Sequence, residues 1–300
     1  MHSLIYFFVS GRAFLAGGSL LILALLIGPP LGRRLRLVSW LLGLIGVIFM
    51  VLSATPLSGS ADKAMGMAVA IWLFAYACRE RTRMIMAAYA RYYLVVVLLL
   101  MVAMEWQYQR PPIFLRDYYP QLYVVGDSIS AGLGSTERPW PQLLADRQHV
   151  TVVNLARVGA TLDTAIDEAR RIQTKQNYIL LEIGGNDLLR QHSPAQFRAD
   201  LRRLFEVVCQ RGNMVVMLEL PLPPFANAYG AAQRELAQEF GVLLIPKRYF
   251  AEILAYNSSA SGDLHLSPSS HEKMADMIWS FIQPFETPVP APGQTLAHGS

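Results

Sequence analysis

Apolar residues are distributed unevenly along the chain, and the first third carries the long uninterrupted runs. Four runs of 15 to 17 residues are nearly free of charge: Ala13 to Pro29, Val38 to Ala54, Ala64 to Cys78 and Tyr92 to Trp106. A membrane-spanning helix needs about 20 apolar residues, with a lower limit near 17, so each run is close to that length. The pattern predicts a transmembrane region over residues 1–106 with about four helices.

The basic residues between these runs predict how the region is oriented. Lys and Arg near the ends of membrane helices are retained in the cytoplasm. The first and third connections carry Arg33, Arg34, Arg36, Arg79, Arg81, Arg83 and Arg91, whereas the N-terminus and the second connection carry only Arg12 and Lys63. With four spans, this bias places the chain after Trp106 outside the cytoplasm. We therefore expect an integral protein of a bacterial-type inner membrane, with the lipid bilayer as its partner. A signal peptide, the competing account of the first run, does not explain the three later runs.

Beyond residue 106 the pattern changes to short apolar stretches separated by longer mixed ones. After a proline-rich linker, 107–120, the predicted strands are Gln121–Val125, Val150–Asn154, Tyr178–Ile183, Met214–Glu219 and Val242–Ile245. The predicted helices are Trp140–Asp146, Thr164–Gln173, Pro194–Arg211, Tyr229–Phe240 and Pro268–Ile282. Alternating strands and helices indicate an α/β fold, here a flavodoxin-like parallel five-stranded sheet with helices on both faces. We expect this domain to cover 121–283 and the tail, 284–300, to be disordered because it has little apolar material.

Composition narrows the classes of function. The net charge of +4 is small for 300 residues and the arginines are scattered, so we expect no nucleic-acid partner. The two cysteines, Cys78 and Cys209, are too few and too separated for a disulfide framework or a metal site. Gly184 and Gly185 follow a predicted strand but lack the spacing of a dinucleotide fingerprint. We therefore expect no metal and no cofactor.

The stretch that organises the second domain is Gly-Asp-Ser at residues 126–128, where the first predicted strand ends. The glycine permits a tight exit from the strand, which puts Ser128 at the carboxyl edge of the sheet, the usual ligand-binding edge of open α/β sheets. Gly159 follows the second strand, Asn186 follows the third, and His265 precedes the last helix. A serine with a backbone N–H, an amide and an imidazole nearby has the groups that acyl transfer requires.

This ordered set resembles the SGNH, or GDSL, hydrolases, and the resemblance covers Gln121 to about Ile282. The stretches Gly-Asp-Ser-Ile-Ser-Ala-Gly at 126–132, Glu182 to Arg190, and Leu220-Pro221 look like the bacterial thioesterase/lysophospholipase branch. The resemblance implies that Ser128 attacks an ester carbonyl and that His265 moves the proton. It also implies an oxyanion hole made by the N–H groups of Ser128 and Gly159 and the amide of Asn186.

One position departs from the family pattern. The family places an aspartate three residues before the histidine, where this chain has Gly262, and Asp263 stands two before. We expect either a triad completed by Asp263 or a Ser-His dyad held by a backbone carbonyl. His271, in the last predicted helix, is expected to be a surface or packing residue. Asp127 and Asp187 are expected to hydrogen-bond the turns that position their neighbours.

The sequence therefore predicts a membrane-anchored serine esterase that hydrolyses acyl or acetyl esters of lipids or envelope glycans. The stiff apolar stretch Pro221 to Phe225 follows the fourth strand, and we expect Leu222 and Phe225 to bind substrate, although a loop that only packs on the domain fits as well. Two alternatives stay open. One is an O-acyltransferase that uses the same residues, and the other is an inactive SGNH-fold binding module, which the displaced Asp263 favours.

Overall fold

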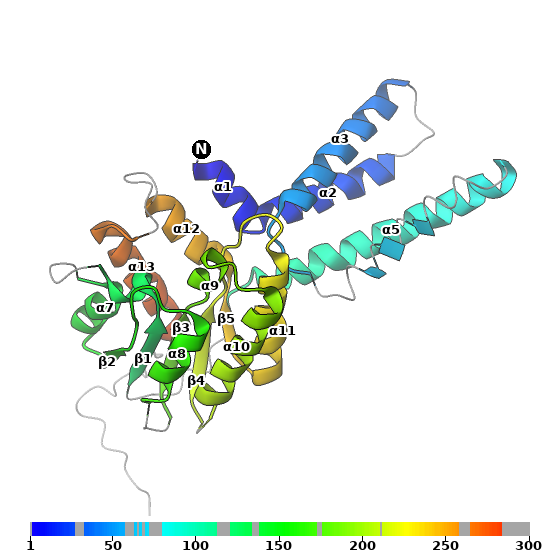
Figure 1. Ribbon diagram of the computed structural model, residues 1–300. Coiled ribbons are helices and arrows are strands. Elements are labelled where there is room, and N and C mark those ends of the chain that lie inside the picture. Colours follow the sequence, from blue (N-terminus) through cyan, green and yellow to red (C-terminus); the bar gives the residue numbers. More distant parts are fainter. Residues whose placement is uncertain are drawn as a thin grey trace, which may run out of the picture.

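The computed structural model describes residues 2–27, 33–57, 63–64, 66–67, 70–71, 80–112, 121–133, 138–172, 176–210, 212–257 and 265–283. Within these residues, a set of apolar helices projects from one side of an α/β domain (Figure 1). The projecting helices are α1 His2–Val9, α2 Arg12–Ile27, α3 Arg33–Leu52 and α5 Glu80–Tyr108. The expected disordered tail and most of the linker lie outside the described residues.

The described helices contain fewer candidate membrane spans than the sequence predicts. Helix α5 is long and apolar enough to cross a membrane over Ile85–Tyr108. Helices α1 and α2 pass the same test together, but the chain bends by 74° between them, and α3 has a shorter apolar stretch, Leu37–Leu52. The third predicted run, Ala64 to Cys78, lies largely outside the described residues. The described part of the chain thus offers one or two candidate spans, and the count of four stays a prediction.

Helices α2 and α3 pack side by side through glycines. A Cβ atom at Gly17 would lie 2.7 Å from the backbone oxygen of Gly46, and one at Gly46 would lie 2.8 Å from the oxygen of Gly17. Close backbone contact through small residues is typical of helices that associate within a membrane. The outer surface of α3 exposes large apolar side chains such as Trp40 and Leu41. Such a surface is uncommon against water.

The α/β domain is built on a five-stranded parallel sheet in the order β2-β1-β3-β4-β5. Its strands are β1 Leu122–Gly126, β2 Val152–Asn154, β3 Tyr178–Glu182, β4 Met214–Leu218 and β5 Leu243–Ile245. Strands β1 and β3 are buried along their whole length, as expected for a parallel sheet covered on both faces. This is the strand order of the flavodoxin-like fold, so the predicted α/β class is confirmed.

Two groups of helices cover the sheet, α8 with α10 and α11, and α7 with α12 and α13 (Figure 1). The helices are α6 Ser128–Ala131, α7 Trp140–Gln148, α8 Leu162–Ala169, α9 Gly185–Leu189, α10 Pro194–Val208, α11 Asn227–Phe240, α12 Lys247–Asn257 and α13 Pro268–Ile282. Helices α10 and α13 each begin with a capping serine followed by proline at the first helical position. Sequence patterning missed α6, α9 and α12, because the first two are single turns and α12 follows a short strand directly.

The projecting helices meet the domain at a buried group of four charges, which we call the junction cluster: Glu105 of α5, Glu219 after β4, Arg234 of α11 and Lys247 of α12. The guanidinium of Arg234 donates from Nη1 to Glu105 Oε2 at 2.7 Å and from Nε to Glu219 Oε1 at 2.6 Å. The ammonium of Lys247 donates to the backbone oxygen of Ala54, and its backbone N–H donates to Glu219 Oε2 at 3.1 Å. All four side chains are at most 5% exposed. Their pairing offsets the cost of removing each charge from water.

The junction cluster ties several projecting segments to one edge of the sheet. Gln109, just after α5, donates to the backbone oxygen of Ser10 at 2.9 Å and to Glu105 Oε1 at 2.8 Å. Arg234 also donates to the backbone oxygen of Pro56, after α3, at 3.0 Å. Because Glu219 follows β4 and Lys247 follows β5, the cluster lies at the carboxyl edge of the sheet. The cluster therefore holds three segments at that edge: the bend between α1 and α2, the segment after α3 and the end of α5.

Candidate active site

Ser128 stands where β1 gives way to the single-turn helix α6. Asp127 caps this turn, because its Oδ1 accepts a hydrogen bond from the backbone N–H of Ile129 at 3.0 Å. A Cβ atom at Gly126 would lie 2.9 Å from the backbone oxygen of Glu182 and from Ser130 Oγ. The glycine is therefore required for space, whereas the sequence suggested that it was required for the turn itself. The result is a half-buried Ser128 at the carboxyl edge.

A second carboxyl group, Glu182 at the end of β3, lies behind Asp127 and was not anticipated from the sequence. Glu182 Oε2 accepts a hydrogen bond from Ser130 Oγ at 2.8 Å, and Ser130 Oγ accepts one from Trp140 Nε1 at 3.1 Å. Burial, reinforced by the nearby Asp127, raises the pKa of Glu182 well above its ordinary value. Burial also raises the pKa of Asp127 to about 6, although hydrogen bonds from Ile129 and Glu182 act in the opposite direction. The two carboxyl groups therefore lie close together in a buried setting that favours their protonated forms.

Gly159 lies between β2 and α8 and adopts a backbone conformation that favours glycine. Its φ is +73°, in the left-handed region. A Cβ atom there would meet only Arg190 Nη2, at 3.5 Å, so the requirement for glycine comes from the backbone conformation. Arg190, just after α9, donates from Nη2 to the backbone oxygen of Gly159 at 2.9 Å. This bond joins the segment after β2 to the segment after β3.

Asn186, in α9, has its side-chain amide oriented by two acceptors. Its Nδ2 donates to the backbone oxygen of Ala160 at 2.9 Å and to Asp127 Oδ2 at 3.3 Å. The amide thus bridges the serine turn and the Gly159 segment. Asp187, beside it, accepts a bond from the backbone N–H of Leu162 at 3.0 Å, which is the turn-positioning role expected for it.

His265 lies half-buried in the segment before α13, and one buried side chain fixes its backbone. Asn257, at the end of α12, donates from Nδ2 to the backbone oxygen of His265 at 2.5 Å. Its Oδ1 accepts a bond from the backbone N–H of Ser267, also at 2.5 Å. His265 is close enough to Asp127 for its charge to lower the pKa of that carboxyl, against the larger effect of burial. Sequence reasoning missed Asn257 because it missed α12.

Asp263 and Gly262 lie outside the described residues, so the third triad position stays a prediction. His271 is buried, and its Nδ1 accepts a hydrogen bond from the backbone N–H of Trp140 at 3.3 Å, so it is a packing residue as expected.

The two residues proposed to bind substrate differ in their exposure. Phe225 is 77% exposed, whereas Leu222 is 2% exposed and packs in the core. Leu222 therefore offers no surface to a substrate, because its side chain turns inward from the loop.

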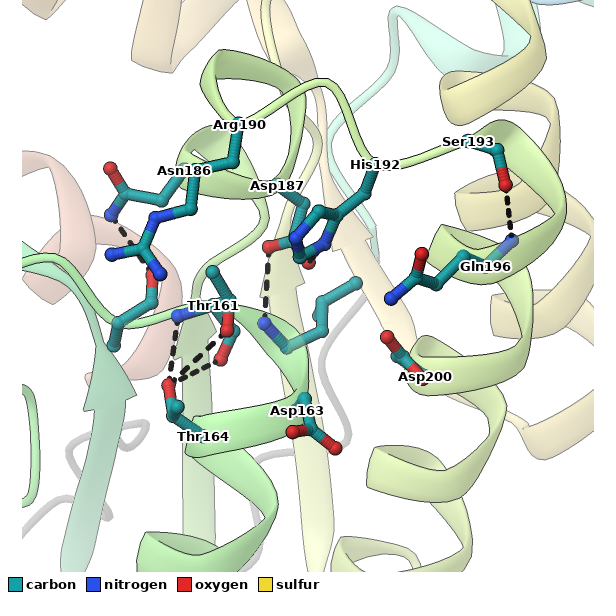
Figure 2. Close-up of polar contacts among 12 residues, drawn as sticks. Thr161, Asp163, Thr164, Asn186, Asp187, Arg190, His192, Ser193, Gln196 and Asp200 are labelled. Atoms are coloured by element: carbon teal, nitrogen blue, oxygen red, sulfur yellow. Dashed lines mark hydrogen bonds and ion pairs between the residues drawn. The ribbon is translucent and has the colours of Figure 1, made fainter.

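Three side chains next to this site could hold a metal ion. Asp187, His192 and Asp200 offer ligand atoms within 4.8 Å of one another (Figure 2). These groups already have partners, since His192 Nδ1 lies 3.1 Å from Asp187 Oδ1 and Arg203 Nη2 donates to Asp200 Oδ1 at 2.5 Å. The guanidinium of Arg203 supplies the positive charge that a cation would bring, so we assign no metal to this group.

The site and the sheet together define a class of protein. A parallel α/β sheet carries Ser128 after its first strand, Gly159 after its second, Asn186 after its third and His265 before its last helix. These residue types are the ones that ester hydrolysis uses. The model of the GDSL-like Lipase/Acylhydrolase family matches residues 124–273, and the chain belongs to that family. It is accordingly a carboxylic ester hydrolase by family.

Several proteins are similar to the same part of the chain. "Thioesterase 1/protease 1/lysophospholipase L1" of Escherichia coli (strain K12) is 29% identical over 175 residues, which cover 54% of this chain and 83% of that protein. "Esterase TesA" of Pseudomonas aeruginosa is 28% identical over 182 residues, covering 54% and 88%. Among solved structures, "Crystal Structure of TesA" has 25% sequence identity and a TM-score of 0.48, covering 54% of this chain and 98% of the other.

Proposed function

We propose that this protein is a membrane-anchored serine esterase in which Ser128 hydrolyses carboxylic esters at the membrane surface. The observation that carries the proposal is the meeting of four motif residues, Ser128, Gly159, Asn186 and His265, at one sheet edge. Membership of an ester-hydrolase family supports the same reaction. The hydrogen bonds of Asn186 and the position of His265 near Asp127 support a single site.

The reaction proceeds in two steps. Ser128 Oγ attacks the ester carbonyl while His265 accepts its proton and then gives it to the leaving alcohol. A water molecule, deprotonated by His265, then attacks the acyl-enzyme and releases the acid and Ser128. The oxyanion of each tetrahedral intermediate accepts hydrogen bonds from the N–H groups of Ser128 and Gly159 and from the amide of Asn186. Loss of one such donor costs about 3 to 4 kcal/mol of barrier.

The amide of Asn186 has both of its hydrogens engaged before substrate arrives. The bond to Ala160 is 2.9 Å long, whereas the bond to Asp127 is 3.3 Å long and therefore weaker. We infer that the N–H group of Asn186 that donates to Asp127 donates to the oxyanion instead once substrate is bound. The bond to Ala160 keeps the amide in place. The hydrogen bond from Glu182 to Asp127 does not involve the amide, so Asp127 keeps that partner when the amide turns to the oxyanion.

The orienting partner of His265 is proposed to be Asp263, with a dyad as the alternative. In a triad, the carboxylate holds the imidazole in the tautomer that can accept the serine proton. Asn257 supports either form, because it fixes the backbone on both sides of Leu266. A well-placed His265 therefore does not depend on Asp263 alone.

Anchoring by four membrane helices, with the catalytic domain outside the cytoplasm, is part of the proposal. It is supported by the four apolar runs, by the length of α5 and by the basic residues of the first and third connections.

The proposed substrates are acyl esters of lipids or of acylated envelope glycans, which a site close to the membrane can reach. The exposed ring of Phe225 is proposed to contact the acyl chain.

The direct test uses a fluorophosphonate probe on membranes that contain the full chain. We expect the probe to label Ser128 and Ser128→Ala to abolish both labelling and p-nitrophenyl ester hydrolysis, with an unchanged circular dichroism spectrum. Labelling of another residue, or undiminished turnover by Ser128→Ala, would overturn the assignment.

A further inference from the structure

The large apolar side chains that the domain exposes are gathered at one edge. Among its described residues, four such side chains lie in the connections that follow the first four strands, and each is between 50% and 77% exposed: Leu133, Val158, Leu189 and Phe225. We call these four residues the collar. A fifth, Tyr256, is also exposed and precedes Asn257, which binds the His265 segment. Exposed apolar residues gathered in this way mark a surface that binds an apolar partner, such as a membrane or another protein.

Phe225 is held outward by its backbone. Its φ is +71°, which is a rare and strained conformation for a bulky side chain. The preceding residues form a turn in which the backbone N–H of Ala226 donates to the oxygen of Pro223 at 3.2 Å. Neighbouring Leu222 is buried, so the same loop packs one apolar side chain inward and displays the other. The exposure of Phe225 is therefore built into the loop.

Two collar residues have an arginine beside them in the chain. Arg157 precedes Val158 and Arg190 follows Leu189, and both arginines are exposed. Arg157 pairs with Glu168 at 2.6 Å, and Arg190 is bonded to Gly159, so both guanidinium groups are held near the collar. Apolar tips flanked by cations are typical of surfaces that rest in the interface of an anionic membrane.

The junction cluster places the membrane helices at the same edge as the collar. Glu219 and Lys247 follow β4 and β5, just as the collar residues follow β1 to β4, and Glu105 belongs to the candidate span of α5. Figure 1 shows α1, α9 and α12 gathered at the end of the domain from which α2 and α3 extend. A bilayer that contains these helices would therefore lie next to the collar.

We propose that the collar inserts into the lipid surface beside the anchor helices, so that the ester substrate enters the site of Ser128 from the bilayer. This inference rests on the proposed esterase function, and it narrows the substrate to an acyl ester of a membrane lipid. The arginines next to the collar contact the lipid phosphates while the apolar side chains reach the acyl boundary. Esters dissolved in water still reach Ser128, but insertion of the collar does not raise the efficiency of their hydrolysis.

A fluorescent label measures insertion without any reference to activity. The full chain with Cys78→Ser and Cys209→Ala carries a single new cysteine, Leu189→Cys, labelled with an environment-sensitive dye and reconstituted in vesicles of zwitterionic and anionic phospholipid. The control is Thr151→Cys, an exposed position before β2 at the opposite edge. We expect the dye at position 189 to be quenched by spin-labelled lipid and shielded from iodide, and the dye at 151 to behave in the opposite way. Equal iodide access at both positions would overturn the proposal.

A kinetic comparison separates insertion from simple binding of the acyl chain. We expect Leu133→Ser/Leu189→Ser to hydrolyse water-dissolved p-nitrophenyl acetate within about twofold of wild type. On a fluorogenic phospholipid ester in vesicles the same variant should lose about tenfold in efficiency. Equal losses on both substrates would overturn the proposal. Absence of esterase activity with a lipid-shielded dye at 189 would reject the proposed function and leave the docking surface supported.

Discussion

The junction cluster makes a quantitative prediction for Arg234→Met. Arg234 contacts two buried carboxylates, Glu105 and Glu219, and its guanidinium carbon lies 3.9 Å from the ring centroid of Tyr108. Burial opposes the charge, but Glu219 and Glu105 outweigh it and raise the pKa of Arg234, so the cation persists in the folded state. Methionine keeps most of the volume and removes the charge. Two carboxylates then face only Lys247, which leaves one buried negative charge uncompensated.

Breaking a buried pair in this way costs about 3 to 5 kcal/mol of unfolding free energy. For a domain of this size, that corresponds to a fall of roughly 6 to 20 °C in the unfolding midpoint. The matched control is Arg198→Met, because Arg198 pairs with Glu235 at the surface, where the two side chains are 41% and 43% exposed. We expect the control to lose at most about 1 kcal/mol.

The assay is thermal unfolding of the full chain in detergent micelles, followed by residual esterase activity and by circular dichroism. Glu105→Gln in the Arg234→Met background should recover part of the loss, since it removes one of the unpaired carboxylates. Equal midpoints for Arg234→Met and Arg198→Met would refute the cluster as the attachment between the domain and its helices.

Three further predictions follow from the site and the topology. Burial raises the pKa of Asp127 to about 6 and that of Glu182 well above its ordinary value. The contribution of these groups to the free energy of unfolding is therefore fully present below roughly pH 4, and it is lost as the pH rises through their folded-state pKa values. The unfolding midpoint should therefore depend less on pH in Glu182→Gln than in wild type, and an unchanged slope would contradict the buried pair. If Asp263 fixes the tautomer of the imidazole, Asp263→Asn should lower kcat by up to roughly 10⁴-fold, whereas a loss of less than about tenfold would favour the dyad. A reporter fused after Pro120 should be active outside the cytoplasm and one fused near Arg83 inside it, and cytoplasmic activity of the first would reject the four-span orientation.

The residues proposed for catalysis were accessible to sequence reasoning because each stands in a short motif with a local physical reason. Ser128 follows an apolar strand and a glycine, and Gly159 adopts a left-handed φ of +73°. The residues that the sequence did not reveal form their hydrogen bonds with residues elsewhere in the chain. Glu182 closes an ordinary buried strand, and Asn257 ends a helix that the pattern did not predict, yet both form hydrogen bonds that shape the site. Leu222 was misjudged because a loop sequence does not specify which apolar side chain points inward.

Glu105 illustrates the same limit for the projecting helices. In the sequence it is a lone acidic residue at the end of an apolar run, whereas in the fold it bonds Arg234, which is 129 positions further along the chain. The apolar pattern correctly identified the helix around Glu105, since that pattern depends only on neighbouring residues. The partner of a buried charge depends on tertiary packing, which periodicity does not encode.

The attachment of the domain determines where the proposed site can act. If the chain from 107 to 120 alone connected the two parts, the carboxyl edge could turn toward or away from the projecting helices. Gly11, in the bend between α1 and α2, argues against such freedom, because a Cβ atom there would lie 2.6 Å from both Gln109 Nε2 and Glu105 Oε1. Its φ of +87° also favours glycine. The bend, the end of α5 and the junction cluster are thus packed too closely to admit a methyl group, so the carboxyl edge keeps one orientation relative to the projecting helices.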